Sequence, residues 1–246
     1  MKIVVIGGTG LIGSKVVETL TDHGHEAIAA SPNSGVDTLT GEGLADVLVG
    51  ADVVVDVSNS PSFEDAAVLD FFIRATTNIL AAEASASVQH HVALSVVGTD
   101  RLPASGYMRA KVSQENLIRA SSIPYTLVHA TQFFEFFSAI AQGATTGDEV
   151  RLSPALVQPI AAQDVSAVVA RVAIEPPRNG MLEIGGPEAF GLNEFVERGL
   201  KARGDSRSVV PDEQAPYFGA LLHGSELVPG EGAELSSTTF AAWLES

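Results

Sequence analysis

Five short and almost unbroken apolar runs alternate with segments of helical pattern along the first part of the chain. Such runs are typical of parallel strands that are buried on both faces of a sheet. Parallel strands need crossover connections, and the helical segments supply them, so the alternation predicts an α/β fold with a Rossmann-type doubly wound parallel sheet. The predicted strands are Ile3 to Ile6, Ala27 to Ala30, Val53 to Val57, His91 to Val96 and Tyr125 to His129.

Helical patterns separate these runs and continue beyond them. The helices expected first are Leu11 to His23, Gly43 to Val49, Phe63 to Ala84, Tyr107 to Ala120 and Phe133 to Gln142. Later come expected strands at Val150 to Leu152 and Met181 to Ile184, and expected helices at Asp164 to Ile174 and Asn193 to Ala202. We expect a single domain over residues 1–246, in which residues from about 145 to 246 contribute a small cap over the carboxyl ends of the strands, where open α/β sheets bind ligands.

A glycine-rich turn follows the first predicted strand and leads directly into the first predicted helix, with the spacing G-x-x-G-x-x-G. The first glycine pair allows a tight turn, Gly10 lets the backbone approach a pyrophosphate without a Cβ in the way, and Gly13 lets the helix pack closely on the strand. The free N–H groups at the helix start attract phosphate. A plain strand-to-helix turn is the alternative. The context favours a dinucleotide site with contacts from Gly7, Thr9, Gly10, Leu11, Ile12 and Gly13.

The turn after the second predicted strand bears on which dinucleotide binds. It reads Ser31-Pro32-Asn33-Ser34-Gly35 and lacks the carboxylate that usually accepts hydrogen bonds from the ribose of NAD. It also lacks an Arg to pair with a 2′-phosphate. The hydroxyl and amide groups of Ser31, Asn33 and Ser34 could surround that phosphate, so we expect NADP, with NAD as the alternative cofactor. A merely polar turn is the simpler interpretation.

A Y-x-x-x-K motif, Tyr107 to Lys111, stands at the start of a predicted helix. This spacing places the phenol and the ammonium on one helix face, one turn apart. A nearby ammonium favours phenolate, so it would lower the pKa of Tyr107 toward the working pH and make it a usable general acid or base. Ser95, at the end of the fourth predicted strand, would donate its hydroxyl hydrogen to a substrate carbonyl. Ser95, Tyr107 and Lys111 are therefore the candidate catalytic residues, although a surface helix turn also gives this motif.

Taken together, several motifs resemble the atypical short-chain dehydrogenase/reductase superfamily, NmrA-like branch. They are G-G-T-G-x-x-G at Gly7 to Gly13, the strand-end Ser95, Y-x-x-x-K at Tyr107 to Lys111, and Ile123 to Val128. The resemblance continues through Gln158 to Ala161 and Asp164-Val165, and weakens toward the end of the chain. It implies a Rossmann fold that binds NADP or NAD, in a superfamily that includes reductases, epimerase-like enzymes and redox-sensing regulators.

The resemblance also implies roles for individual residues. Ser58 and Asn59 would pass near the cofactor, Lys111 would hold the nicotinamide ribose, and Tyr107 would donate a proton. Many NmrA-like relatives lack the Tyr, so Tyr107 favours an enzyme over a sensor. His129 is a departure, because relatives often have Arg there.

A phenylalanine-rich segment follows the fifth predicted strand, where the crevice should lie. Its four Phe residues could line a pocket for an aromatic substrate, and core packing is the rival role for two of them. Thr131 and Gln132 could reach the nicotinamide or the substrate, whereas Thr131 could equally cap a helix. The candidate substrate-binding residues are Thr131, Gln132, Phe133 and Phe136.

Charge and composition limit the partners. With 30 Asp and Glu against 14 Lys and Arg, the net charge of −16 repels phosphate backbones. The absence of Cys excludes thiolate catalysis, and His90-His91 would point to opposite faces of a strand, so no metal site is expected. No uncharged apolar stretch approaches the roughly 20 residues that cross a bilayer, and the N-terminus lacks the pattern of a secretory signal. We expect a soluble cytoplasmic protein with a small-molecule substrate, no nucleic acid or membrane partner, and a homodimer left open.

Three functions are consistent with these patterns. The leading hypothesis is an NAD(P)H-dependent oxidoreductase that reduces a small aromatic carbonyl or quinone substrate by hydride transfer. The second is a non-catalytic NmrA-like regulator that senses NADP(H). The third, suggested only by the phenylalanine cluster and by family analogy, is a monooxygenase-like or auxiliary tailoring enzyme acting on an aromatic natural product.

Overall fold

The computed structural model describes residues 1–246 and contains one parallel sheet of seven strands. Its order is β12-β9-β5-β4-β3-β1-β2, and every neighbouring pair is parallel. This architecture confirms the expected fold class. The strands are β1 (Lys2–Ile6), β2 (Glu26–Ala30), β3 (Val53–Asp56), β4 (His90–Val96), β5 (Tyr125–Ala130), β9 (Gly180–Gly185) and β12 (Glu234–Leu235).

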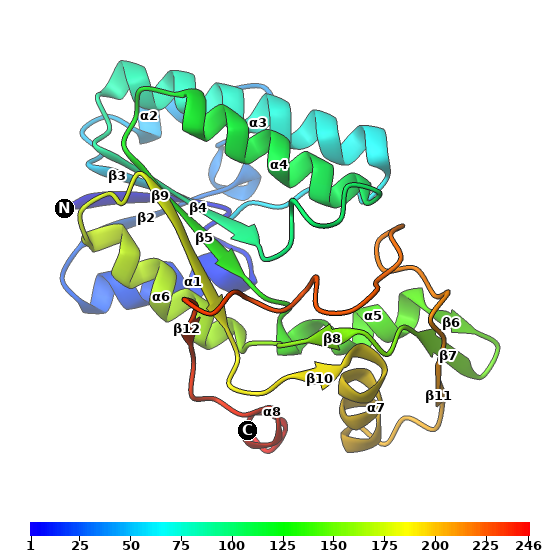
Figure 1. The fold of residues 1–246 in the computed structure, drawn as a ribbon. Helices are drawn as coiled ribbons and strands as arrows, with labels where there is room; N and C mark the ends of the chain where they lie inside the picture. Colours follow the sequence, from blue (N-terminus) through cyan, green and yellow to red (C-terminus); the bar gives the residue numbers. More distant parts are fainter.

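Helices cover both faces of this sheet (Figure 1). Because successive side chains of a strand point to opposite faces, Ile3 and Val5 pack in the cluster that contains α1 and α6, whereas Val4 and Ile6 pack with α2 and α3. The helices are α1 (Leu11–Asp22) and α6 (Ala162–Ile174) on one face, and α2 (Leu44–Val47), α3 (Asp65–Ala86) and α4 (Gly106–Ala120) on the other. None of them combines the length and apolarity needed to span a membrane.

The strand order reverses beside β1, which lies between β2 and β3. At such a switch point the connections leave toward opposite faces, so the carboxyl ends of β1 and β3 open a crevice in which α/β proteins bind ligands. The glycine-rich turn after β1 and the turn after β3 meet there, since a Cβ on Gly7 would lie 2.9 Å from the backbone nitrogen of Ser58.

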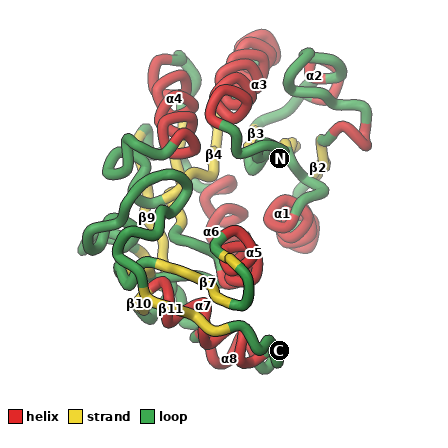
Figure 2. The backbone as a smooth tube through the Cα atoms, turned by 90° about the vertical axis from the view of Figure 1, so that its right-hand side faces the viewer, coloured by secondary structure: helices red, strands yellow, loops and turns green.

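A smaller layer, the cap, is grouped at the bottom of Figure 2. It has its own core, in which Phe134, Phe137, Phe195 and Phe240 pack together, and Trp243 stacks on Phe240 with ring centres 5.8 Å apart. Its elements are α5 (Phe137–Gly143), β6 (Thr145–Thr146), β7 (Glu149–Leu152), β8 (Leu156–Val157), β10 (Phe190–Gly191), α7 (Leu192–Ala202), β11 (Ser208–Pro211) and α8 (Phe240–Leu244).

Two sequence expectations are corrected by this arrangement. Strand β9, expected in the cap, pairs with β5 in the central sheet, and α6 packs against α1 beneath that sheet. The cap is therefore smaller than residues 145–246. The expected helix from Phe133 is also interrupted, because residues Phe134–Phe136 form a 3-10 turn before α5 begins at Phe137.

Candidate functional site

The glycine-rich turn has the geometry of a phosphate cradle. Gly7 has a φ of 78°, in the left-handed region, and a Cβ on Gly13 would lie 2.2 Å from the Gly7 oxygen. Both positions therefore require glycine. Gly10 differs, because a Cβ added there would meet only the Gly7 oxygen, at 3.3 Å, and would otherwise occupy open space. Because Gly10 is the N-cap of α1 and no side chain caps that helix, the first N–H groups remain available to an anion.

The remaining residues of the turn divide between surface and core. Thr9 and Leu11 are exposed, whereas Ile12 is buried in the core cluster beneath the sheet. Ile12 can therefore offer only its backbone to a ligand. The turn fits the pyrophosphate of a dinucleotide.

The turn after β2 is a 3-10 helix from Pro32 to Ser34. The Ser34 hydroxyl accepts from the Ser31 N–H and lies 2.9 Å from the Ser31 carbonyl oxygen, so it is occupied within the turn. The Ser31 hydroxyl is buried and has no partner, and Asn33 is exposed. Asn33 is therefore exposed to a cofactor, whereas Ser34 is committed to the turn and the Ser31 hydroxyl is buried beneath it.

Asp56 organises the turn after β3. Its carboxylate accepts from the Ser58 N–H at 3.0 Å, from the Ser58 hydroxyl at 2.6 Å and from the Gln114 amide at 3.0 Å. Ser58 therefore reaches the crevice with its backbone, while its hydroxyl hydrogen is held by Asp56. Asn59 is exposed and accepts from the Ser60 N–H.

Lys111 is buried beneath the crevice rather than free at its surface. Its ammonium donates to the Leu94 carbonyl at 2.9 Å and to the Gln114 side chain, and it lies 4.4 Å from the centre of the Phe72 ring. Burial lowers the pKa of Lys111 to about 8, although the carboxylates of Asp56 and Glu115 oppose this shift. Every polar contact that the ammonium makes is thus internal.

Tyr107 lies at the start of α4 in an aromatic enclosure. Its ring centre is 5.6 Å from that of Phe63, 5.7 Å from that of Phe218 and 6.2 Å from that of Phe72. Burial alone raises the pKa of Tyr107 to about 12. This corrects the expectation that Lys111 lowers the pKa of Tyr107: the two residues share a helix face, but the phenol is held in its protonated form.

Ser95 is also placed differently from the expectation. Its hydroxyl donates to Glu115 at 2.6 Å, so its only hydrogen is not available to a substrate carbonyl. Glu115 also lies 3.1 Å from His129 and 2.8 Å from Arg119. Burial acts to raise the pKa of Glu115, but the hydrogen bond and charge of His129, with Ser95 and Arg119, lower it to about 2. His129 thus binds a buried carboxylate.

The four residues expected to bind substrate separate into different environments. Thr131 donates to the Gln158 carbonyl at 2.6 Å, which commits its hydroxyl to the backbone. Gln132 is only 6% exposed, and neither its amide nitrogen nor its amide oxygen has a partner. Phe133 and Phe136 stack with ring centres 5.3 Å apart, and Phe136 is exposed.

The two histidines that begin β4 are structural. The His91 Nδ1 atom lies 2.7 Å from the Glu83 Oε1 atom, and both side chains are fully buried. The His90 Nε2 atom lies 2.9 Å from the Thr126 hydroxyl. No group of three His, Asp or Glu side chains is arranged to hold a metal ion.

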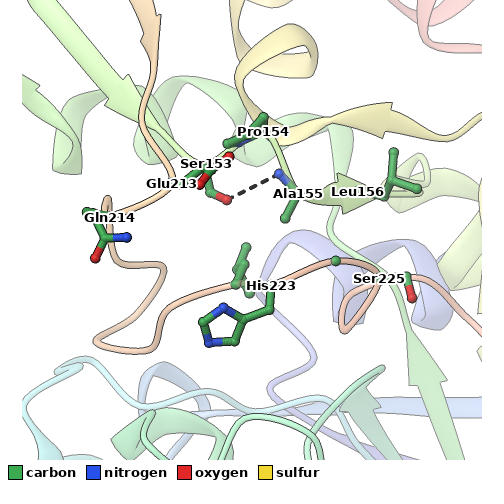
Figure 3. Close-up of a pocket in the computed structure, with 10 residues that line it drawn as sticks. Ser153, Pro154, Ala155, Leu156, Glu213, Gln214, His223 and Ser225 are labelled. Atoms are coloured by element: carbon green, nitrogen blue, oxygen red, sulfur yellow. Dashed lines mark hydrogen bonds between the residues drawn. The ribbon is translucent and has the colours of Figure 1, made fainter.

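A separate cavity of about 490 Å³ lies in the cap (Figure 3). It is lined by residues 153–156 and by parts of the 213–225 segment, including His223. None of the residues expected from the sequence lines it. The same segment carries Tyr217 and Phe218, which face the Tyr107 enclosure.

The sequence reasoning missed Asp56, Gln114, Glu115 and Tyr217. A signal existed for Gln114 and Glu115, because residues three and four positions after Lys111 share its helix face. A signal for Asp56 existed too, as a carboxylate that ends a buried strand. Tyr217 gives no local signal, since it stands in a cap loop far along the chain.

A phosphate cradle at the switch point of a parallel sheet, with a phenol in an aromatic enclosure, defines a dinucleotide-binding protein of the Rossmann class. A family model described as NAD(P)H-binding matches residues 7–176, and the chain belongs to this family. The expected resemblance to NAD(P)-binding Rossmann proteins is confirmed.

Similar proteins include reductases. The chain is 30% identical over 161 residues to an isoflavone reductase homolog from Nicotiana tabacum, covering 55% of this chain and 50% of that protein. It spans about half the length of the curated relatives it matches, with 46% and 50% of their length covered.

Two solved structures share the fold over nearly the whole chain. A dTDP-4-dehydrorhamnose reductase from Clostridium acetobutylicum has a TM-score of 0.74 at 17% identity, covering 100% of this chain and 98% of that chain. A NADPH-dependent quinone oxidoreductase from Escherichia coli has a TM-score of 0.68 at 18% identity, covering 99% and 98%.

Proposed function

We propose that this protein is a NADPH-dependent reductase that transfers hydride to a small aromatic carbonyl or quinone, with Tyr107 as the proton donor. The observation that carries the proposal is Tyr107 itself, a protonated phenol in an aromatic enclosure that a planar substrate could enter. The reductases among the similar proteins support the same class of reaction.

The residues present fit a nicotinamide dinucleotide. The open space at Gly10 and the uncapped start of α1 suit a pyrophosphate, and the exposed Asn33 follows β2, where the adenosine ribose would be expected. Because the turn after β2 contains no carboxylate, NADP remains the favoured form. The bound cofactor would supply the hydride.

The chain's own contribution is a proton, a dry enclosure and a fixed geometry. Tyr107 would give its hydroxyl proton to the substrate oxygen as hydride reaches the carbon, and solvent would restore that proton afterwards. Phe63, Phe72 and Phe218 exclude water around the phenol. Lys111 lies on the same helix, α4, as Tyr107, and its ammonium donates to the Leu94 carbonyl in β4 and to Gln114. These bonds hold α4 in place against the sheet.

Cofactor binding is tested by Gly10→Ala. A Cβ at Gly10 meets one backbone oxygen and otherwise projects into the cradle, so we expect a normal melting temperature and an affinity for NADPH about tenfold lower or worse. Isothermal titration calorimetry with NADPH and NADH measures this loss and the cofactor preference together.

The matched control is Gly143→Ala, since that glycine also has open space around its Cβ position but lies at the end of α5. It should leave both affinities unchanged. Unaltered NADPH binding by Gly10→Ala would contradict the cradle, and a preference for NADH would reject the NADP assignment.

The buried ammonium of Lys111 predicts a pH dependence of stability. Its pKa is about 8 in the folded protein and 10.5 in the unfolded chain, so the unfolded chain binds the proton more tightly. Stability should therefore rise between pH 8 and 10.5, by up to about 3 kcal/mol relative to Lys111→Met. Urea unfolding of wild type and Lys111→Met across this pH range measures the difference between their free energies of unfolding. The contributions of all other charged groups are the same in both proteins and cancel in this difference. A constant difference would show that Lys111 titrates normally.

One observation favours a second function. Ser95 and Lys111 are both committed to internal partners, so two of the three expected catalytic residues do not face a substrate. We propose a non-catalytic NADP(H) sensor as the second candidate. It should bind NADP and NADPH with unequal affinity and oxidise no NADPH in the presence of quinones or aromatic aldehydes, whereas the reductase turns over.

A further inference from the structure

Gln132 stands out among the polar groups of the molecule that the fold leaves unused. It lies two residues after the end of β5, and its backbone is fixed because its carbonyl accepts from the Ile160 N–H at 2.8 Å. Its side chain is 94% buried by area, being 6% exposed, yet neither amide atom has a hydrogen-bond partner. Buried amides are almost always hydrogen-bonded, so this amide is suited to take up a partner such as a water or a ligand oxygen.

A second polar group reaches the same place from the cap. Tyr217 and Ala220 exchange backbone hydrogen bonds of 2.8 and 3.0 Å, which closes a tight turn with Phe218 and Gly219 at its tip. The Tyr217 ring is 8% exposed. Burial raises the pKa of the Tyr217 hydroxyl, Tyr107 adds to this rise, and the Gln132 side chain opposes it. The Tyr217 ring packs edge-on against Phe218 with ring centres 4.8 Å apart, and Phe218 lies 5.7 Å from Tyr107. Tyr217 therefore lies beside the Tyr107 enclosure, with the Gln132 side chain close to its hydroxyl.

The tip of this turn adopts a backbone that favours glycine. Phe218 has a φ of 45° and Gly219 a φ of 81°, and an aromatic residue is a poor choice for a left-handed position. The strained conformation presents the Phe218 ring to Phe63 at 5.5 Å and to Tyr107 at 5.7 Å. Phe63 and Phe218 are 51% and 42% exposed, so flat apolar faces remain open to a ligand. Strain retained at such a site points to a function.

We infer that Gln132 and Tyr217 hold the acceptor oxygen of a planar aromatic substrate for Tyr107, while Phe218 covers its ring. This inference rests on the proposed reductase function and deepens it. An amide N–H and a phenol O–H can both donate to one carbonyl or quinone oxygen, which is the task that Ser95 cannot perform while it donates to Glu115. The exposed ring faces of Phe63 and Phe218 select flat molecules over aliphatic ones.

The test uses Gln132→Met and Tyr217→Phe, which keep size and remove the polar group. Wild type and variants are assayed with NADPH and menadione, a flat quinone, and with diacetyl, an aliphatic dicarbonyl. We expect KM for menadione to rise about tenfold in each variant while the affinity for NADPH and the melting temperature stay the same. Phe218→Ala should reduce the preference for menadione over diacetyl about fivefold or more, because it removes ring contact.

Tyr125→Phe is the control, because Tyr125 lies at the opposite end of β5 and packs against a separate small cluster that contains Ile118 and Ile123. It should change neither KM. Unchanged menadione KM in both Gln132→Met and Tyr217→Phe would overturn the inference.

A binding measurement separates this inference from the proposed function. Naphthol, which cannot be reduced by hydride transfer, is titrated into each protein saturated with NADP. Binding by wild type that weakens about tenfold in Gln132→Met supports the substrate site even if no turnover is found, and then only the proposed function fails. Equal binding by both proteins, or none by wild type, overturns the site whatever the turnover.

Discussion

Replacing Tyr107 by Phe is expected to lower the turnover of carbonyl or quinone reduction at least about tenfold, and by as much as about 10⁴-fold. The variant loses the hydroxyl proton but keeps the ring that packs on Phe63, Phe72 and Phe218, so the enclosure and the cofactor cradle remain. Steady-state kinetics with menadione and calorimetry with NADPH measure the two quantities separately, and the affinity for NADPH should stay nearly constant.

The pH profile gives this prediction a second readout. Because burial raises the pKa of Tyr107 to about 12, the phenol stays protonated through the neutral and mildly alkaline range. Deprotonation of Tyr107 should therefore cause no loss of kcat/KM below about pH 10. Turnover equal to wild type in Tyr107→Phe would remove Tyr107 from the mechanism, and Tyr125→Phe, at the start of β5, supplies the matched phenol deletion away from the site.

Removing Glu115 should have the largest effect on stability. Its carboxylate is 3% exposed and contacts Ser95, His129 and Arg119, so Glu115→Ala leaves buried donors without an acceptor. Breaking a buried charged pair in this way costs about 3 to 5 kcal/mol. Urea unfolding at pH 7 measures the loss. The matched control is Glu194→Ala, which breaks an exposed pair with Arg198 and should cost less than about 1 kcal/mol.

The same carboxylate predicts the acid limb of the stability curve. The pKa of Glu115 is lowered from 4.5 to about 2 in the folded protein, so its stabilisation is present above pH 4.5 and is lost as the pH falls through 2. The difference between wild type and Glu115→Ala should therefore shrink over this interval. A difference at pH 7 no larger than that of Glu194→Ala would mean that the Glu115 network contributes little.

Local patterns predicted most of the fold. The fifth strand was expected at Tyr125 to His129 and is observed at Tyr125–Ala130. It was predictable because the apolar pattern of a buried strand and the residues of the turn after it are adjacent in the sequence. The strand expected at Met181 to Ile184 also exists, as Gly180–Gly185, but its place in the central sheet was not foreseen. Which strand it pairs with depends on residues that lie more than fifty positions away.

The candidate site divides in the same way. The cradle at Gly7, Gly10 and Gly13 was expected because it follows from the spacing of one turn. The orientation of Ser95 was not, because it is decided by Glu115 on a helix that packs across the strand. Tyr217 was missed entirely, since only the folding of the cap brings it, through Phe218, beside the Tyr107 enclosure.

The chain passes repeatedly between the central sheet and the cap. It leaves after β5 to build α5 and β7, returns through α6 and β9, leaves again for α7 and β11, and comes back at β12 before ending in α8 (Figure 1). Several chain segments therefore connect the cap to the sheet. Because no single linker joins the two, the cap has no single hinge about which it could rotate as a rigid body. Ending the chain after residue 176, where the family match ends, would remove β9 and leave the edge of β5 without a partner strand. It would also remove Phe195 and Phe240 from the core of the cap.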